Sequence, residues 1–438
     1  MTPYYADDWL TVYHGDSRAV MAEMEPESVN CVVTSPPYWG LRDYGTATWD
    51  GGDAGCDHIQ TRNLKRDTNG GMLPAGEGTR GQQSSTASSS IGFRDVCRRC
   101  GAIRIDSQLG LDASPDAYVA ALVDVFREVR RVLRSDGTVW LNLGDSYNGV
   151  GRGEKANGLQ VAARATSQRT VSGLKSKDLV GIPWRVAFAL QADGWYLRSD
   201  IIWSKPNPMP ESVTDRPTKN HEYMFLLSKS PRYYFDADAV REPSTDSTIT
   251  RLAQPGLPRQ IGSDRVPGKT NGNMKAVGDP SGRNIRSVWT IATAPYSGAH
   301  FATFPRNLVE PCIKAGTSDR GVCPECGAPW EPVIERTKGR DWNAKKRGND
   351  RLVYGNGTGA DMDMDRIANP PRRVGMRPTC RHDAEPVPAT VLDPFAGSGT
   401  TGMVAQSLSR RAVLIDMSMD YLEQLMERNR HIPLGLRA

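Results

Sequence analysis

The sequence lacks the segments that carry a chain into or across a membrane. No basic and apolar signal stands at the N-terminus, and no apolar run approaches the roughly 20 residues that a membrane-spanning helix requires. A strong excess of one charge is also missing, because 55 Lys and Arg residues face 50 Asp and Glu residues. The net charge of +5 is compatible with a polyanionic partner without requiring one. We expect no membrane contact and a cytoplasmic location, in a bacterium or a phage-infected host cell.

The sequence does contain enough apolar material for a large core. Its 438 residues, 38% of them hydrophobic, exceed one minimal domain and predict a catalytic domain that carries insertions. Strand and helix patterns alternate, which predicts a mostly parallel sheet with helices on both faces. The expected strands are 31–34, 138–143, 197–203, 222–228, 390–392 and 412–415, the expected helices are 118–133, 184–190, 401–407 and 419–429, and a turn is expected at 135–137.

A glycine-containing turn follows one of these strands near the C-terminus. Residues 391–401 read Val-Leu-Asp-Pro-Phe-Ala-Gly-Ser-Gly-Thr-Thr, an apolar strand that runs through the turn into a helix. In this Rossmann-type arrangement the backbone comes close to a ligand, and a helix N-terminus faces the negative charge of that ligand. Asp416 follows the next strand, 17 residues beyond Gly399. An acidic side chain at this position can receive the hydroxyls of a ribose.

A second string suits chemistry on an amino group. Residues 34–39 read Thr-Ser-Pro-Pro-Tyr-Trp. An exocyclic amino nitrogen is a poor nucleophile because its lone pair is delocalised into the ring, and acceptors aimed at its hydrogens favour the tetrahedral nitrogen that attacks a methyl group. We assign Ser35 Oγ and the Pro36 carbonyl as these acceptors, with the two prolines restricting the backbone. The Tyr38 ring can stack on a flipped-out base, and Trp39 can extend that wall.

Both strings resemble motifs of the DNA amino-methyltransferases. The glycine turn is similar to their motif I and the Ser-Pro-Pro-Tyr string to their motif IV, in the circularly permuted order of the beta class. Segments 128–147, 194–210 and 221–222 are also similar to that class, and residues 299–305 resemble motif X. The likeness covers most of the chain outside polar loops. It implies a Rossmann-like, seven-stranded methyltransferase fold of the α/β class and S-adenosylmethionine as the cofactor.

The resemblance also implies which residues act. The catalytic set is Ser35, Pro36, Pro37 and Tyr38. The cofactor set is Asp393, Phe395, Gly397, Ser398, Gly399 and Thr400 around the methionine part, Asp416 at the ribose, and Asp16 of the His-Gly-Asp turn near the adenine. In this family, a serine at the first position of motif IV is more typical of enzymes that methylate N4 of cytosine, and an aspartate is more typical of those that methylate N6 of adenine. We therefore expect N4-cytosine methylation of double-stranded DNA by base flipping, with N6-adenine methylation as the alternative.

Two further interpretations stay beside this one. The chain could be a non-catalytic, zinc-stabilised DNA-binding protein that keeps a cofactor fold. Cytosine C5 methylation, which uses a cysteine thiolate after a proline, could in principle use the dipeptide at 311–312. That dipeptide lies in a helix-like stretch without the strand-and-loop setting of a nucleophile, so we expect Cys312 to be a buried structural residue.

Six of the eight cysteines form two matched groups. The first is Cys56, His58, Cys97 and Cys100, and the second is Cys323, Cys326, Cys380 and His382. Each group offers three thiolates and one imidazole, the usual set of a closed structural zinc site, and a Cys-Gly-Ala sequence follows both Cys-x-x-Cys pairs. Metal binding can offset the entropy of closing long polar loops. We expect two separate mononuclear Zn²⁺ sites, the first of them the better candidate to touch DNA.

These motifs divide the chain. Residues 1–45 and 111–240 form the catalytic part of the methyltransferase domain, 46–110 the first zinc insertion, 241–286 the target recognition region, 287–315 the motif X region, 316–388 the second zinc insertion and 389–438 the cofactor part. The recognition region carries eight basic and four acidic residues, which suits phosphate contacts. No nuclease site is recognisable on the chain, which fits a solitary or phage-borne modification enzyme. The oligomeric state is open, with a homodimer as one option.

Overall fold

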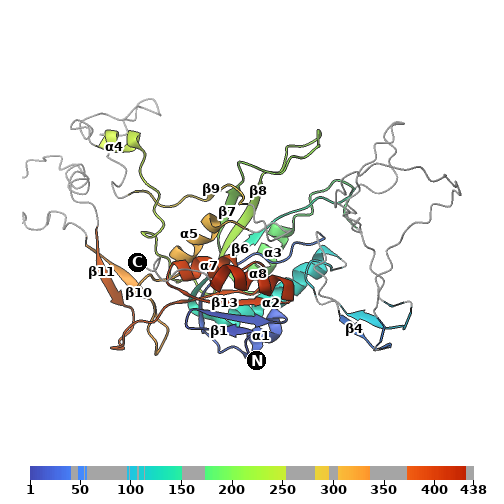
Figure 1. The fold of residues 1–438 in the computed structure, drawn as a ribbon. Helices are drawn as coiled ribbons and strands as arrows, with labels where there is room; N and C mark the ends of the chain where they lie inside the picture. Colours follow the sequence, from blue (N-terminus) through green and yellow to red (C-terminus); the bar gives the residue numbers. More distant parts are fainter. Residues whose placement is uncertain are drawn as a thin grey trace, which may run out of the picture. The chain divides into compact units, whose positions relative to one another are not determined.

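A computed structural model gives the arrangement of these elements (Figure 1). It describes residues 1–40, 48–53, 55–56, 96–97, 99–105, 108–112, 114–149, 173–252, 282–294, 304–335 and 372–430. The chain forms two compact units. Unit 1 consists of residues 1–35, 125–142 and 190–438, and unit 2 consists of residues 36–124 and 143–189. The catalytic part expected at 111–240 is thus shared between the units, while the cofactor part lies wholly in unit 1.

Unit 1 is built on a nine-stranded sheet. Its strand order is β1 (Tyr5–Ala6), β2 (Leu10–His14), β13 (Arg411–Asp416), β12 (Thr390–Asp393), β3 (Val29–Thr34), β6 (Leu133–Leu143), β8 (His221–Ser228), β7 (Tyr196–Ser204) and β9 (Val288–Thr290). The neighbours from β2 to β6 pair in parallel, whereas β8 runs antiparallel to β7. The seven strands from β2 to β7 form the predicted methyltransferase sheet, and β1 and β9 extend its edges.

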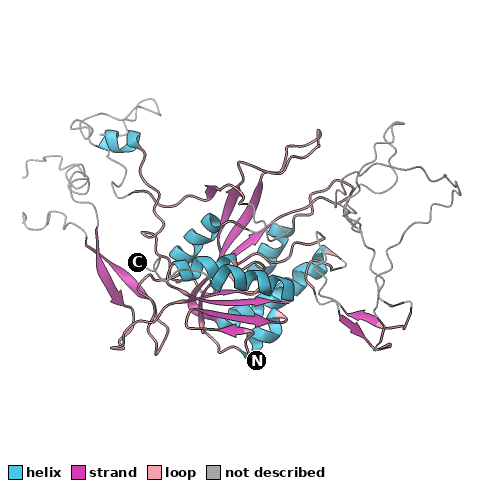
Figure 2. Cartoon of the chain, in the orientation of Figure 1, coloured by secondary structure: helices cyan, strands magenta, loops and turns pink. Residues whose placement is uncertain are grey.

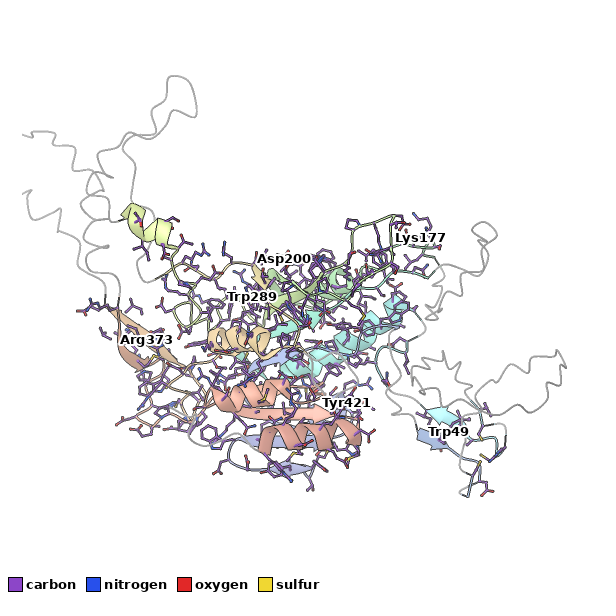
Figure 3. The ribbon with its side chains drawn as sticks, turned by 45° about the horizontal axis from the view of Figure 1, so that its top comes forward. Trp49, Lys177, Asp200, Trp289, Arg373 and Tyr421 are labelled. Carbon is purple, nitrogen blue, oxygen red and sulfur yellow. The ribbon has the colours of Figure 1, made fainter. Side chains whose placement is uncertain are left out.

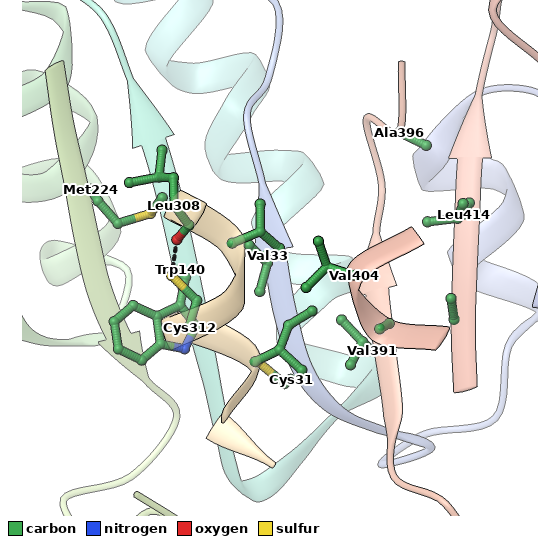
Figure 4. Close-up of a cluster of buried hydrophobic side chains, with 14 of the residues drawn as sticks. Cys31, Val33, Trp140, Met224, Leu308, Cys312, Val391, Ala396, Val404 and Leu414 are labelled. Atoms are coloured by element: carbon green, nitrogen blue, oxygen red, sulfur yellow. Dashed lines mark hydrogen bonds between the residues drawn. The ribbon is translucent and has the colours of Figure 1, made fainter. Parts of the chain in front are cut away.

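Helices cover both faces of this sheet because its central strands are apolar on both sides. All six residues of β3 are buried. In Figure 4, Cys312 and Val404 lie over one face, against Cys31 and Val33, while other helices pass behind the sheet. The covering helices are α5 (Arg306–Gly316), α7 (Thr400–Ser407) and α8 (Met419–Arg430) on the first side and α1 (Ser17–Glu23) with the unit 1 part of α2 (Pro115–Val132) on the second. The predicted helices around 118–133, 401–407 and 419–429 are all present.

Smaller elements accompany the sheet (Figure 2). In unit 1, β10 (Trp330–Glu335) pairs antiparallel with β11 (Arg372–Pro378), and α4 (Asp246–Leu252) lies in the recognition region. Residues 253–281 of that region are outside the described residues. In unit 2, β4 (Thr48–Asp50) pairs antiparallel with β5 (Ile103–Ile105). Helix α3 (Ile182–Ala192) matches the predicted helix around 184–190 and begins in this unit.

One predicted element is wrong. The turn expected at 135–137 is an irregularity inside β6, which begins at Leu133 directly after α2. Val29 of β3 pairs with Leu133 and Cys31 pairs with Thr138, so the extra residues of β6 bulge out and the strand then returns to register. Glycine is favoured at 137 because a Cβ there would come within 2.9 Å of the Asn30 carbonyl oxygen. No helix in the described part of the chain is both long and apolar enough to cross a membrane.

Candidate functional site

The two strings that the sequence singles out are joined directly in unit 1. Strand β3, which leads into Ser35, pairs in parallel with β12, which leads into the glycine turn. Thr34 Oγ1 donates a hydrogen bond to Asp393 Oδ1 (2.6 Å), and Thr401 Oγ1 donates to Asp393 Oδ2 (2.7 Å) and to the Val33 carbonyl (3.2 Å). The strand end that carries Ser35 is thereby fixed against the turn that follows β12.

Asp393 itself is a positioning residue in this structure. Its side chain has no exposed surface, and the Phe395 amide donates a third hydrogen bond to its carboxylate (3.1 Å). Burial raises the pKa of Asp393 to about 6, although the hydrogen bonds from Thr34 and Thr401 act in the opposite direction. The resemblance places Asp393 beside the methionine part of the cofactor; the carboxylate here connects the two strand ends.

Hydrogen bonds to Asp416 hold the glycine turn in shape. Gly397 N donates to Asp416 Oδ2 (2.8 Å), and Ser418 N donates to Asp416 Oδ1 (2.8 Å). Burial raises the pKa of Asp416 against the lowering effect of these amide hydrogen bonds. Gly397 has a φ of +49°, and a Cβ there would meet nothing within 4 Å, so the backbone is open on that side. Gly399 has a φ of +76°, and a Cβ there would clash with α8.

Arg428 of α8 is a member of this site that the sequence did not single out. Its Nη1 donates to the Ser398 carbonyl (2.9 Å), to Ser398 Oγ (2.5 Å) and to Thr400 Oγ1 (3.3 Å). Ser398 and Thr400 are only 4% exposed. The guanidinium therefore holds the first turn of α7 from outside, and it brings a positive charge to the N-terminal end of that helix.

A chain of polar side chains leads away from Ser35 within unit 1. Ser35 Oγ donates to Asn142 Oδ1 (3.4 Å), and Asn142 Nδ2 donates to Glu222 Oε2 (3.3 Å) and to the Tyr223 carbonyl (3.1 Å). Lys205 Nζ is paired with Glu222 and lies 4.2 Å from the centre of the Trp203 ring. Asn142 is 1% exposed, so this network orients the serine from the buried side. The resemblance had indicated the segments of Lys205 and Glu222, but not their link to Ser35.

In unit 2, the residues after Ser35 are fixed by their own contacts. The buried Tyr118 hydroxyl donates to the Pro37 carbonyl (2.8 Å). A Cβ on Gly144 would come within 2.5 Å of Tyr38 Cε2, so glycine leaves the space that the Tyr38 ring fills. Trp39 is 5% exposed and donates from Nε1 to the Asp112 carbonyl (3.1 Å). The expectation that Trp39 extends a stacking wall is therefore wrong, because the indole is packed inside the unit.

Other predicted site residues occupy structural positions or lie outside the described residues. Asp16 caps α1, where its carboxylate accepts from the Arg18 amide and forms an ion pair with Arg18 (2.7 Å). Partial burial acts to raise the pKa of Asp16, but the hydrogen bonds from Arg18 outweigh it and leave the pKa lowered. Of the motif X segment 299–305, only residues 304–305 are described.

Cys312 is buried as expected. It lies in α5 with no exposed surface, and its thiol donates to the Leu308 carbonyl (3.2 Å), as Figure 4 shows. Burial raises the pKa of the Cys312 thiol well above its ordinary value. A thiol in this environment is a poor nucleophile, which agrees with the rejection of C5 chemistry.

The structure brings the cysteines together as two groups. In unit 2, the thiols of Cys56, Cys97 and Cys100 lie within 4.8 Å of one another, with 3.8 Å between Cys56 Sγ and Cys97 Sγ. His58 lies outside the described residues. In unit 1, the ligand atoms of Cys323, Cys326, Cys380 and His382 lie within 4.8 Å of one another, with 3.5 Å between Cys323 Sγ and His382 Nδ1.

The two Cys-x-x-Cys turns have the same backbone hydrogen bonds. In the first, Cys97 N donates to the Ala102 carbonyl (2.7 Å) and Gly101 N donates to the Cys97 carbonyl (2.8 Å). In the second, the corresponding bonds are from Cys323 to Ala328 (2.9 Å) and from Gly327 to Cys323 (2.7 Å). Both glycines have a positive φ, +76° and +68°. The repeated Cys-Gly-Ala sequence therefore produces the same turn twice.

Comparison with known proteins places this geometry in a family. The family model of the N6/N4 DNA methylases matches residues 29–323 and 385–427. The type II methyltransferase M.Cfr9I of Citrobacter freundii is 34% identical over 420 residues, which are 95% of this chain and 87% of the relative. M.SmaI of Serratia marcescens is 34% identical over 416 residues, 94% of this chain and 88% of the relative.

A similar solved structure is that of the PvuII DNA methyltransferase (cytosine-N4-specific), at 15% identity and a TM-score of 0.46, covering 99% of this chain and 90% of that chain. The family match spans both the Ser-Pro-Pro-Tyr string and the glycine turn, and the curated relatives match over nearly the whole chain. The chain therefore belongs to the N6/N4 family of DNA methylases and is an S-adenosylmethionine-dependent DNA methyltransferase.

Proposed function

We propose that this enzyme methylates N4 of cytosine in double-stranded DNA after flipping the base out of the duplex. The observation that carries the proposal is the fixed geometry between the Ser35 strand and the glycine turn through Asp393. An amino group held at Ser35 can then meet a methyl donor held at the turn, which is the near-attack arrangement that the reaction requires.

The residues of the turn suit S-adenosylmethionine. The backbone at Gly397 is open to a ligand, Asp416 stands at the end of β13 where ribose hydroxyls can reach it, and Arg428 places positive charge near Ser398 for a carboxylate. When bound, this cofactor supplies an electrophilic methyl group on a sulfonium. The protein contributes the cradle and its preorganised dipoles.

Ser35 and Pro36 supply the hydrogen-bond acceptors for the amino group of the base. The Ser35 proton is directed to Asn142, so the hydroxyl oxygen is oriented as an acceptor for one hydrogen of the amino group. The Pro36 carbonyl accepts the other hydrogen, and the nitrogen lone pair is then directed to the methyl carbon. As the nitrogen takes the methyl group, the bond from that methyl to the sulfonium sulfur would break with its electron pair left on the sulfur, and the nitrogen would lose one proton to solvent. Tyr38 stacks on the flipped base, a contact worth roughly 1 to 3 kcal/mol.

Serine at the first position supports cytosine over adenine. In the family, serine leans to N4-cytosine and aspartate to N6-adenine, and here residue 35 is serine. We also propose that the polar and basic region 241–286 contacts DNA phosphates and that the enzyme works in the cytoplasm of a bacterial cell. Digestion of 241–286 by a protease should slow when DNA is added, and an unchanged digestion pattern would contradict the DNA contact.

Both cysteine groups fit Zn²⁺. In a tetrahedral site with Zn–S bonds of about 2.3 Å, two sulfur atoms lie about 3.8 Å apart. The 3.8 Å between Cys56 and Cys97 and the 3.5 Å between Cys323 and His382 agree with this geometry. We propose one structural zinc ion per group, with His58 as the fourth ligand of the first.

Mass spectrometry of nucleosides from the DNA of an expressing, methylation-deficient host tests the base. We expect N4-methylcytosine, and N6-methyladenine instead would refute the cytosine assignment. Ser35→Ala should lower methyl transfer about 10²- to 10³-fold, as loss of one preorganised hydrogen-bonding group does elsewhere. Binding of S-adenosylmethionine and of DNA should persist, which also separates the enzyme from a non-catalytic DNA-binding protein. Ser28→Ala, at an exposed serine just before β3, is the matched control.

A further inference from the structure

The segment between β7 and β8 presents an apolar side chain to solvent. Met209 is 86% exposed, more than any other large hydrophobic residue in the described part of the chain. Figure 1 shows that this segment extends beyond the ends of the two strands. It is rich in proline, with Pro206, Pro208 and Pro210 around the methionine. Prolines restrict the backbone, so Met209 is held out by a stiffened chain.

Side-chain contacts brace the segment on both sides of Met209. Asn207 Nδ2 donates to Thr293 Oγ1 (3.0 Å), and Thr293 N donates back to Asn207 Oδ1 (3.0 Å). On the other side, Glu211 accepts from Arg216 Nη1 (2.7 Å) and from the Lys219 amide (3.2 Å). The exposed methionine therefore lies in a segment that is held by hydrogen bonds on both sides of it.

The base of the segment is connected to the catalytic serine. Lys205 N donates to the Asn220 carbonyl (2.8 Å), which closes the segment at its root. Lys205 is paired with Glu222, which accepts from Asn142, the partner of Ser35. The segment therefore rises from the end of the sheet at which the amino group would be held. Met209 lies four positions after Lys205, a length of chain that can span up to about 14 Å, which exceeds the depth of a DNA major groove of about 8.5 Å.

We propose that Met209 is a wedge that enters the duplex next to the target base and occupies the space that the flipped base leaves. Apolar side chains, methionine among them, act in this way when they separate base steps. The proposal rests on the proposed function, because it assumes a base flipped from double-stranded DNA. It assigns to Met209 a role in opening the base pair, which is separate from the chemistry at Ser35.

Single-turnover methyl transfer on two duplexes tests this role. Both carry the recognition site found by methylome sequencing of an expressing host; in one the target base is paired, and in the other its partner is an abasic nucleotide. Met209→Ala should slow transfer at least 10-fold on the paired duplex and less than 2-fold on the abasic one, where no pair has to be opened. Met209→Leu should stay within about 3-fold of the wild type on both. Val374→Ala, at another exposed apolar residue, should change neither rate.

Equal losses on both duplexes would overturn the wedge and leave the methyltransferase function standing. Unchanged rates on both would also overturn it, and would be expected if Met209 meets a protein partner instead. If the wild-type enzyme methylates neither duplex, the proposed function fails, and the wedge fails with it.

Discussion

The cofactor turn and the two cysteine turns differ in the interactions that hold their backbone in place. All three are irregular backbone with glycines at positive φ. The cofactor turn is held by the carboxylates of Asp393, which is buried, and Asp416, which is half-buried, since both accept hydrogen bonds from groups around it. The cysteine turns are held by backbone hydrogen bonds, and each brings a group of potential metal ligands together. Side-chain carboxylates thus hold the first turn, whereas each cysteine turn belongs to a group of side chains that could hold a metal ion.

The cysteine groups also differ from each other in their attachment. In unit 1, Arg134 Nη1 donates to the Cys326 carbonyl (2.6 Å), and Arg134 is paired with Asp136 of β6 (3.0 Å). The second group is therefore bonded to the catalytic sheet. The first group lies in unit 2 beside the small β4–β5 pair. Loss of a metal ion from the second group should therefore destabilise the nine-stranded sheet of unit 1 more than loss from the first group.

The largest expected effect is the loss of the second metal. Cys380→Ala should reduce bound zinc from two ions to one per chain and destabilise unit 1 by several kcal/mol, because metal binding energy is folding energy in such sites. Cys56→Ala should also remove one zinc ion, but it should lower the melting temperature of unit 1 less than Cys380→Ala does. Metal analysis and calorimetry measure both. Arg381→Ala, at the exposed residue between two ligands, is the control. Full retention of zinc in Cys380→Ala would contradict the site.

The next largest effect is on the free energy of unfolding, which should depend on pH through Asp393 at the start of the cofactor turn. The pKa of Asp393 is raised to about 6, so the folded state binds the proton more tightly than the unfolded state does. The stability due to this proton is complete below about pH 4 and is lost as the pH rises through about 6. Against Asp393→Asn, wild-type stability should fall by on the order of 3 kcal/mol between pH 4 and pH 7.

Urea unfolding across this pH range measures the Asp393 effect. Asp8→Asn, at an exposed aspartate, is the control variant. A constant difference between wild type and Asp393→Asn at every pH would mean that the carboxyl is not perturbed by its burial.

A smaller effect should appear at the cofactor. Asp416→Asn keeps the size of the side chain but removes the charge that accepts the Gly397 and Ser418 amides. The Kd for S-adenosylmethionine should rise about 10-fold, the equivalent of about 1.4 kcal/mol, while the fold is retained. Isothermal titration calorimetry measures the change, with Asp420→Asn on the exposed side of α8 as the control. Equal affinity in both variants would remove Asp416 from the cofactor site.

The smallest effect is expected at Cys312. Cys312→Ala should cost about 1 kcal/mol of stability through the lost sulfur contacts and leave methyl transfer within 2-fold of the wild type. A loss of several orders of magnitude in activity, with the fold intact by circular dichroism, would revive covalent C5 chemistry.

The sequence predicted the parts of the fold that depend on local pattern. Central strands such as β3 and β12 are apolar runs bounded by turns, and the parallel sheet follows from their alternation with helices. The bulge in β6 was misread because Ser-Asp-Gly is a turn signal, and only the pairing with β3 shows that the strand continues through it. Arg428 and the Asn142–Glu222 link could not be foreseen, because their partners are brought to them by tertiary folding.

The position of β12 has a consequence for how the enzyme is made. This strand, residues 390–393, sits between β3 and β13 in the sheet, although nearly the whole described chain precedes it. A nascent chain that has not yet reached Thr390 has β2 and β3 without the two strands that join them. The ribosome must therefore release the chain as far as β13 before the sheet can close, so termination before Thr390 should yield aggregation-prone fragments and never a partly active modification enzyme.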